Sequence, residues 1–300
     1  MANPKVTKAV IAAAGFGTRF LPQTKAMPKE MLPLVDKPVI QYIVEQLVEA
    51  GIQDIIIVSG YSKRPIEDHF DMPSEELLAN LRAGGSKKAH FIKEMQDLAD
   101  MANFVYVRQK GPYGTATPIM NASHLIGDEP FIYTFADDFA IGEPNMYQQM
   151  ITAHEIYGGT ILPCIRVTSD LDFERYGFVG GKNINKHIVK ADKIVEKPGR
   201  TKAPSDFATI GGYLLTSDTF DYIAEAVQKL PKDKEFFLTS EVLQPMLADG
   251  KDIFGLEFDY DIRYDTGNPL DYVKATIDQA LRRPDIAPEL KEYLLTRLQS

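Results

Sequence analysis

The residues that could do chemistry near the start of the chain lie in one short stretch. Gly15 and Gly17 follow the apolar run Ala9–Ala12, which is typical of a buried strand. A small glycine-containing loop after a strand lets backbone N–H groups approach a polyphosphate. Arg19 and Lys29 add positive charge where anionic oxygens would lie. The stretch therefore predicts a nucleoside triphosphate site, whose loop is formed by Ala13, Ala14, Gly15, Gly17 and Thr18.

The same loop permits a second interpretation, because many strand-to-helix turns use glycine only for a tight bend. The dinucleotide-binding pattern is incomplete, since Phe20 occupies the position of its third glycine. The chain contains no Gly-x-x-x-x-Gly-Lys-Ser/Thr stretch, so the loop is not a P-loop. Spacing alone leaves both phosphate binding and a structural turn open.

Acidic residues that could hold a divalent cation occur at the ends of two strand-like segments. Asp137 and Asp138 follow the apolar run Phe131–Phe135, and Asp265 precedes a helix that begins near Pro269. Carboxylates combined with water ligands suit magnesium. Each group also has a plainer interpretation, since paired acids occur in turns and Asp265 could cap the helix.

Candidates for binding a sugar phosphate and a base lie further along the chain. Glu196 could accept hydrogen bonds from sugar hydroxyls and Lys197 could bind a phosphate, unless the two belong to a surface ion-pair stretch. Gly177 and Gly211 lie in strand-like sequence, where glycine permits a close backbone approach. Gln109 carries both a donor and an acceptor, so it could pair with a pyrimidine edge or be a solvated amide.

The order of these motifs resembles that of the sugar-1-phosphate nucleotidylyltransferase family. Gly-x-Gly-Thr-Arg followed by Pro-Lys-Glu-Met-Leu resembles its N-terminal signature, and residues 24–38 are most similar to the bacterial members that use UTP and glucose 1-phosphate. The stretch Ala136-Asp137-Asp138 matches the family's Gly-Asp-Asp motif, with Ala136 in place of glycine. The stretch Tyr264-Asp265-Thr266-Gly267 matches its second acidic motif, Asp-x-Gly. The resemblance covers nearly the whole chain.

The resemblance implies that glucose 1-phosphate attacks the α-phosphorus of UTP in line, with Mg²⁺, to give UDP-glucose and pyrophosphate. It implies that Arg19 stabilises the β- and γ-phosphates, that Lys29 holds the sugar or α-phosphate region, and that these two are the catalytic residues. It assigns the metal to Asp137 and Asp265. The implied nucleotide-binding residues are Ala13, Ala14, Gly15, Gly17, Thr18, Glu30, Gln109 and Gly114, with the last three favouring uracil. The implied sugar-phosphate ligands are Gly177, Glu196, Lys197 and Gly211.

Two segments depart from the family pattern and keep other activities open. The stretch Gly114-Thr115-Ala116 is closer to thymidylyl- and guanylyltransferase relatives, and the segment 234–241 replaces Gly-Glu-Ile-Gln-Leu-Thr-Asp with a stretch that contains Phe236 and Phe237. A thymidylyltransferase or another sugar-1-phosphate nucleotidylyltransferase is therefore an alternative. So is a non-catalytic regulatory protein that binds sugar nucleotides, although the retained cations and aspartates oppose it. A metal-dependent glycosyltransferase would usually carry Asp-x-Asp, which Asp137-Asp138 is not.

The composition is that of an ordinary globular protein of 300 residues, with 44% hydrophobic and 25% charged residues. The net charge of −9 argues against a nucleic-acid surface. No run approaches the roughly 18 apolar residues of a membrane span, and the N-terminus lacks an apolar signal region. We therefore expect a cytoplasmic protein with no nucleic-acid or membrane partner. Cys164 is the single cysteine, so no disulfide can form within the chain. The resemblance to the family implies a homodimer or homotetramer.

The elements that must position these residues alternate between strand and helix in the first half and are richer in strands in the second. The predicted strands are Ala9–Ala12, Ile55–Val58, Phe104–Val107, Phe131–Phe135, Thr160–Val167, Phe178–Gly180, His187–Val195 and Ala208–Leu215. The predicted helices are Val39–Ala50, Ser74–Arg82, His90–Ala99, Ser217–Leu230, Leu238–Ala248, Pro269–Arg282 and Ala287–Leu298. This pattern favours an α/β fold with a Rossmann-like, mixed and mostly parallel sheet flanked by helices, and the resemblance implies the GT-A-like nucleotidyltransferase fold.

One compact domain of residues 1–300 is predicted, because the sequence shows no linker or repeat. Its nucleotide-binding half would span about residues 1–150 and its β-rich sugar-phosphate half about residues 151–285. A C-terminal helix would occupy residues 286–300.

Overall fold

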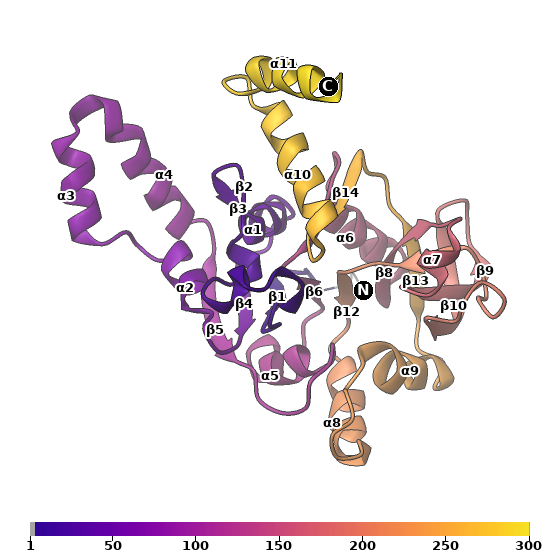
Figure 1. Ribbon diagram of the computed structural model, residues 1–300. Helices are drawn as coiled ribbons and strands as arrows, with labels where there is room; N and C mark the ends of the chain where they lie inside the picture. Colours follow the sequence, from indigo (N-terminus) through magenta and orange to yellow (C-terminus); the bar gives the residue numbers. More distant parts are fainter. Residues whose placement is uncertain (1–3, 300) are drawn as a thin grey trace.

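A ten-stranded sheet runs through the centre of the molecule (Figure 1). In the computed structural model, which describes residues 4–299, the strand order is β11-β9-β10-β13-β8-β12-β6-β1-β4-β5. The strands of this sheet are β1 (Lys8–Ala13), β4 (Asp54–Ser59), β5 (Asn103–Arg108), β6 (Phe131–Phe135), β8 (Thr160–Arg166), β9 (Gly177–Asn183), β10 (Ile188–Glu196), β11 (Phe207–Thr209), β12 (Tyr213–Leu215) and β13 (Ile253–Glu257). Two small sheets accompany it, one of β2 (Pro33–Leu34) and β3 (Lys37–Pro38) and one of β7 (Asp138–Ile141) and β14 (Ile262–Asp265).

The two halves of the large sheet differ in strand direction. Strands β5, β4, β1 and β6 pair in parallel, in the order expected of a Rossmann-like half. Strand β12 pairs antiparallel with both β6 and β8, and β9 pairs antiparallel with β10 and β11. The α/β class and the mixed sheet are confirmed, but "mostly parallel" is wrong beyond β6, where β8–β13 is the parallel pair.

Helices cover both faces of the sheet. They are α1 (Val39–Glu49), α2 (Arg64–Phe70), α3 (Glu75–Ala83), α4 (Ala89–Ala99), α5 (Thr117–Ile126), α6 (Met146–Tyr157), α7 (Asp170–Phe173), α8 (Thr219–Lys229), α9 (Gln244–Ala248), α10 (Pro269–Arg282) and α11 (Ala287–Leu298). Short turns are η1 (Thr18–Phe20), η2 (Gln23–Lys25), η3 (Lys29–Met31) and η4 (Gly85–Lys88), and η5 (Thr239–Leu243) is a π-helix. The α3–α4 hairpin and the α10–α11 pair project from the body (Figure 1).

The core is divided by the sheet into two main clusters, which follow the alternation of side chains along the strands. In β1, Ala9 and Ile11 pack in one cluster with apolar residues of α1, α2, α6 and α10. Val10 points to the other face, where it packs with residues of α5, α8 and α9. Because β1 is buried on both sides, its sequence is continuously apolar.

Several boundaries differ from the sequence prediction. The segment Ala208–Leu215 forms two strands, β11 and β12, which both pair with β8 but differ in their second neighbour, β9 for β11 and β6 for β12. The chain turns between them at Gly211 and Gly212, and Gly212 adopts φ +107°. The predicted helix Leu238–Ala248 begins with the π-helical turn η5. Strands β2, β3, β7, β13 and β14 and helices α2, α5, α6 and α7 were not predicted from the sequence.

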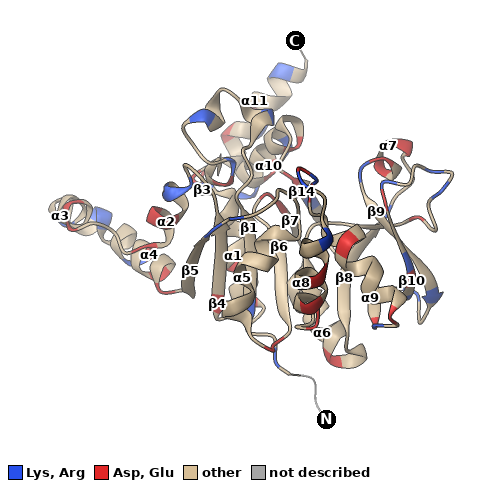
Figure 2. Cartoon of the chain, turned by 90° about the horizontal axis from the view of Figure 1, so that it is seen from below, with Lys and Arg blue, Asp and Glu red and all other residues tan. Residues whose placement is uncertain are grey.

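None of the helices among residues 4–299 is both long enough and apolar enough to cross a membrane. Figure 2 shows Lys and Arg interspersed with Asp and Glu along many of the elements. The predicted boundaries at residues 1–3 and 300 lie outside the described residues.

Candidate active site

The loop after β1 and the turn η3 lie against each other at the carboxyl end of the parallel strands. A side chain on Gly17, which adopts φ +65°, would come within 3.1 Å of Cβ of Lys29 and of Cγ2 of Thr24. The Thr24 hydroxyl donates to the Gly17 carbonyl at 2.7 Å. Gly15 is also adjacent, since a Cβ on it would lie 3.7 Å from Nζ of Lys29. Gly17 thus lets the loop pack on the Lys29 stem, whereas a Cβ on Gly15 would make an ordinary van der Waals contact with Lys29.

The ammonium of Lys29 forms an ion pair with the carboxylate of Asp137, which follows β6. Burial by itself would lower the pKa of Lys29, but the negative charges of Asp137, Glu30 and Asp265 outweigh it, and the net shift is upward. Lys29 is therefore a fixed positive charge at neutral pH.

Asp137 and Asp265 lie close together because Thr266 binds the backbone of Asp137. The Thr266 N–H and hydroxyl both donate to the Asp137 carbonyl oxygen, at 2.9 and 2.8 Å. A Cβ built on Gly267 would lie 2.7 Å from Oδ2 of Asp137 and 3.0 Å from Oδ1 of Asp265. The two carboxylate oxygens are therefore no further apart than the sum of these distances, and only glycine leaves the space between them open.

Two converging carboxylates fit a magnesium ion, since Mg²⁺ commonly takes one or two carboxylates together with substrate phosphates and water. Among residues 4–299 no cluster of three or more His, Cys, Asp or Glu could hold a metal without such help. The donor set at Asp137 and Asp265 therefore suits a cation that arrives with a phosphate.

A pocket of about 190 Å³ borders Asp137 and is called the nucleotide-side pocket, because it contains residues predicted to bind the nucleotide. Its lining includes Gln109, which follows β5, and Lys29. The other lining residues are Ala12, Ala14, Gly15, Phe16, Tyr113, Gly114, Thr115, Pro118, Tyr133, Phe135 and Asp137. The sequence-predicted residues Ala14, Gly15, Gln109 and Gly114 are thus brought together.

Gly114 has a structural role that the sequence does not reveal. It adopts φ +131°, and a Cβ on it would lie 2.2 Å from the carbonyl oxygen of Phe236. The backbone of Phe236 occupies the space where a Cβ of Gly114 would lie. Gly114 therefore borders the pocket and also lets the Phe236 backbone pack against it.

A second pocket, of about 280 Å³, also borders Asp137 and is called the sugar-side pocket, because all four predicted sugar-phosphate ligands line it. A Cβ on Gly177 would lie 3.0 Å from Oε2 of Glu196. A Cβ on Gly211 would lie 2.7 Å from the Phe135 ring. Both glycines therefore keep the pocket open. Lys197 adopts φ +45°, an uncommon conformation for a side-chain-bearing residue that recurs at functional sites.

Arg263, Asp138 and Tyr176 form a hydrogen-bonded unit in the wall of the sugar-side pocket. Asp138 was considered from the sequence as a cation ligand, and its pairing with Arg263 was not predicted. The Arg263 guanidinium donates to Oδ2 of Asp138 at 2.5 Å and to the Tyr176 hydroxyl at 3.1 Å. Burial raises the pKa of Asp138 to about 6 even though Arg263 opposes the shift. Because β14 pairs with β7 so that Asp265 faces Asp138, this unit lies between Asp265 and the sugar-side pocket. The sequence feature that could have indicated this unit is Arg263, an arginine two residues before Asp265.

Other predicted residues lie near the site without lining either pocket, namely Ala13, Gly17, Thr18, Arg19 and Glu30. Arg19 is exposed and donates to the Gly267 carbonyl at 3.3 Å, which places it beside the aspartate pair. Glu30 is fully buried, and Oε2 accepts a hydrogen bond from Nζ of Lys63 at 2.6 Å. In this arrangement Glu30 supports the turn that carries Lys29 and has no surface that could touch a base.

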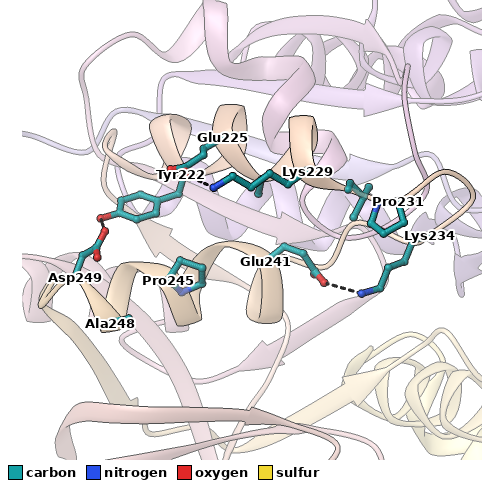
Figure 3. Close-up of a pocket in the computed structure, with 11 residues that line it drawn as sticks. Tyr222, Glu225, Lys229, Pro231, Lys234, Glu241, Pro245, Ala248 and Asp249 are labelled. Carbon is teal, nitrogen blue, oxygen red and sulfur yellow. Dashed lines mark hydrogen bonds and ion pairs between the residues drawn. The ribbon is translucent and has the colours of Figure 1, made fainter.

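A larger hollow, of about 460 Å³, lies away from these residues between α8 and α9 (Figure 3). Its charged side chains pair with each other, as in Glu225–Lys229 and Lys234–Glu241. Tyr222 donates to Asp249 across it at 2.8 Å. It brings together none of the predicted site residues.

Known proteins resemble the chain over nearly its whole length. The family described as Nucleotidyl transferase matches residues 8–281. The UTP–glucose-1-phosphate uridylyltransferase YngB of Bacillus subtilis is 42% identical over 97% of this chain and 95% of its own length. UTP–glucose-1-phosphate uridylyltransferase 2 of Staphylococcus saprophyticus is 41% identical over 97% of both chains.

Solved structures agree with the sequence relatives. A UDP-glucose pyrophosphorylase complexed with UDP-glucose superposes with a TM-score of 0.81 at 35% identity, over 93% of this chain and 100% of the other. A UTP-bound UGPase from Acinetobacter baumannii gives a TM-score of 0.86 at 29% identity, over 97% of this chain and 99% of the other.

Proposed function

This chain belongs to the nucleotidyl transferase family, and from that premise we propose that it is a UTP–glucose-1-phosphate uridylyltransferase. In the proposed reaction, a phosphate oxygen of glucose 1-phosphate attacks the α-phosphorus of UTP. A new P–O bond forms while the bond to the β-phosphate oxygen breaks, so UDP-glucose is made and pyrophosphate leaves with the electron pair.

The observation that carries this proposal is that the two pockets meet at one place. Thr115, Phe135 and Asp137 line both of them. A nucleotide in the smaller pocket and a sugar phosphate in the larger one would therefore bring their phosphates together beside Asp137 and Lys29. In-line transfer between two bound substrates requires this juxtaposition.

On the nucleotide side, Gln109 is the residue that we propose pairs with the uracil edge, with backbone groups of Ala14, Gly15 and Gly114 around it. Lys29, a fixed cation, would hold the α-phosphate and offset the charge that develops during transfer. Arg19, beside Gly267, would stabilise the departing pyrophosphate. Glu30 is proposed as a support for Lys29, in place of the base contact expected from the sequence.

On the sugar side, Glu196 would accept hydrogen bonds from sugar hydroxyls, and Lys197 would bind the phosphate of glucose 1-phosphate. Gly177 and Gly211 would let the sugar approach the backbone. No protein base is needed in this scheme, because the attacking phosphate oxygen is already anionic.

Mg²⁺ is the proposed cofactor, with Asp137 and Asp265 as its protein ligands. When bound there, it would supply positive charge to the phosphate oxygens. The hydrogen bond from Thr266 to the Asp137 carbonyl keeps the two aspartates close together, as binding one metal ion would require.

The test is the release of pyrophosphate with UTP and glucose 1-phosphate, with and without Mg²⁺, compared with dTTP, GTP and other sugar 1-phosphates. We expect the highest kcat/KM with UTP and glucose 1-phosphate and none without the metal. A higher kcat/KM with dTTP would identify a thymidylyltransferase. Binding of UDP-glucose without pyrophosphate release from any pair would indicate a regulatory protein.

The protein is also proposed to act as a homodimer or homotetramer in the cytoplasm, where the reaction's UTP is found. Helix α11 buries only Ala287 among its described residues and leaves Tyr293, Leu295 and Leu298 exposed. A second copy could cover these side chains. Light scattering of the purified protein, with Leu295→Glu as the comparison, tests this assembly.

A further inference from the structure

The base side and the sugar side of the site are joined by a contact between two loops, Tyr113–Ala116 and Phe236–Leu238. The Phe236 N–H donates to the Tyr113 carbonyl at 2.6 Å, and the Ala116 N–H donates to the Phe236 carbonyl at 3.0 Å. The Leu238 N–H donates to Oγ1 of Thr115 at 2.9 Å. Two segments far apart in the sequence are thus held together by three hydrogen bonds.

The loop–loop contact fixes the backbone of Phe237, which lies between the buried residues Phe236 and Leu238. Phe236 and Leu238 are buried in the core, at 0% and 1% exposure. Phe237 is half-buried and lines the sugar-side pocket. Its N–H donates to Oε2 of Glu241 at 3.0 Å, at the start of the π-helix η5. The backbone that carries the Phe237 ring is therefore fixed on both sides.

The wall that Phe237 contributes to is aromatic. Phe135 and Tyr213 line the same pocket, and their rings contact each other edge to face at 6.4 Å between centroids. Aromatic faces pack well on apolar C–H surface, and their negative π-face gains nothing from a carboxylate substituent. The same pocket carries Glu196 and Lys197, which suit hydroxyl and phosphate groups.

We propose that Phe237 is a specificity-determining residue, whose ring packs against the C–H face of the hexose in a sugar 1-phosphate or nucleotide sugar. This inference rests on the proposed function and deepens it. A neutral hexose with equatorial hydroxyls presents such a C–H face to Phe237. A uronic acid, or a sugar with an axial hydroxyl that points toward the Phe237 ring, presents it less well.

Thr115 is the positioning residue of this arrangement. It lines both pockets, and its hydroxyl accepts the Leu238 N–H. Removing the hydroxyl takes away one of the three hydrogen bonds that hold the Phe236–Leu238 loop, at a position next to Gly114. A change at Thr115 should therefore affect nucleotide and sugar together, whereas a change at Phe237 should affect the sugar alone.

The experiment measures Kd by calorimetry for UDP and for UDP-glucose. With Phe237→Leu we expect about tenfold weaker binding of UDP-glucose, as for the loss of one apolar contact, and an unchanged Kd for UDP. Phe237→Tyr keeps the aromatic ring and should bind both ligands with the wild-type Kd. This variant still tests the inference if Phe237→Leu fails to fold. Tyr222→Phe, in the hollow between α8 and α9, is the control and should change neither Kd.

Thr115→Val should raise both Kd values, and Thr115→Ser should restore them, because serine keeps the hydroxyl acceptor. If Phe237→Leu keeps the wild-type ratio of the two Kd values, the inference about Phe237 is overturned while the proposed function stands. If the wild-type protein binds neither UDP nor UDP-glucose, the proposed function itself is contradicted.

Discussion

The ammonium of Lys29 and the carboxylate of Asp137 form an ion pair where the two pockets adjoin. Each belongs to a different part of the chain, Lys29 to the turn η3 and Asp137 to the end of β6. The pair therefore joins the glycine loop of the nucleotide side to the aspartates that would hold the metal. A phosphate bound at this position would lie next to both the Lys29 ammonium and the proposed metal site.

Replacing Lys29 by alanine should lower the rate of pyrophosphate release by roughly 10²–10³, the usual cost of removing a charge that stabilises a transition state. The fold should survive, because the side chain ends in the open site. Lys25→Ala, an exposed lysine on the nearby turn η2, is the matched control and should keep the wild-type rate. A Lys29→Ala enzyme with near-normal turnover would remove Lys29 from the mechanism.

Thr266 should control the requirement for Mg²⁺ without contacting substrate. Thr266→Val removes the hydroxyl donor to Asp137 but keeps the N–H donor, so the two aspartates lose part of their alignment. We expect the Mg²⁺ concentration for half-maximal rate to rise about tenfold, in the range reported for removing groups that orient metal ligands. Thr266→Ser should restore it. An unchanged Mg²⁺ dependence in Thr266→Val would show that the alignment does not depend on this hydroxyl.

Much of the site was predictable because short motifs carry it. The apolar run before Asp137 placed that residue at a strand end, and β6 ends at Phe135 as expected. The family was predicted correctly from the glycine loop and the Pro-Lys-Glu-Met-Leu segment. The residue roles stay predictions, although the pockets gather most of those residues.

What the sequence could not show are contacts between distant segments. Strands β7 and β14 are four residues each, too short for an apolar pattern to stand out, yet their pairing sets Asp265 opposite Asp138. Glu30 was expected to contact the base, but it is buried and pairs with Lys63, which lies 33 residues further along the chain. Gly114 packs on Phe236, which belongs to a loop in the other half of the chain.

The buried pair Glu30–Lys63 should behave differently in single and double variants. Burial raises the pKa of Glu30 and lowers that of Lys63, so burial favours the neutral form of both groups. Lys63→Met leaves Glu30 buried without its partner and should lower the free energy of unfolding by about 3–5 kcal/mol. Glu30→Leu combined with Lys63→Met should recover most of that loss. Urea unfolding measures both; equal stability of Lys63→Met and wild type would contradict this account.

His69 should make stability depend on pH. Burial lowers its pKa below the ordinary value of 6.5, with Glu45 opposing the shift. The folded protein then binds fewer protons than the unfolded chain, so the free energy of unfolding should decrease as pH falls from about 6.5 toward the lowered pKa. His69→Gln keeps a partner for Gln41, which lies 3.0 Å from Nε2 of His69, and should lack this decrease. Thermal melts from pH 7.5 to 5 compare the two slopes. Parallel slopes would show that His69 is not the group responsible.

The most direct test of the central claim is a crystal structure of the protein soaked with UDP-glucose and Mg²⁺. The account predicts uracil between Gln109 and Gly114, the hexose against Phe237 in the sugar-side pocket, and the phosphates beside Lys29 and the aspartate pair. Clear density for the ligand at another place, or Asp137 and Asp265 turned away from each other with the ligand bound, would contradict it.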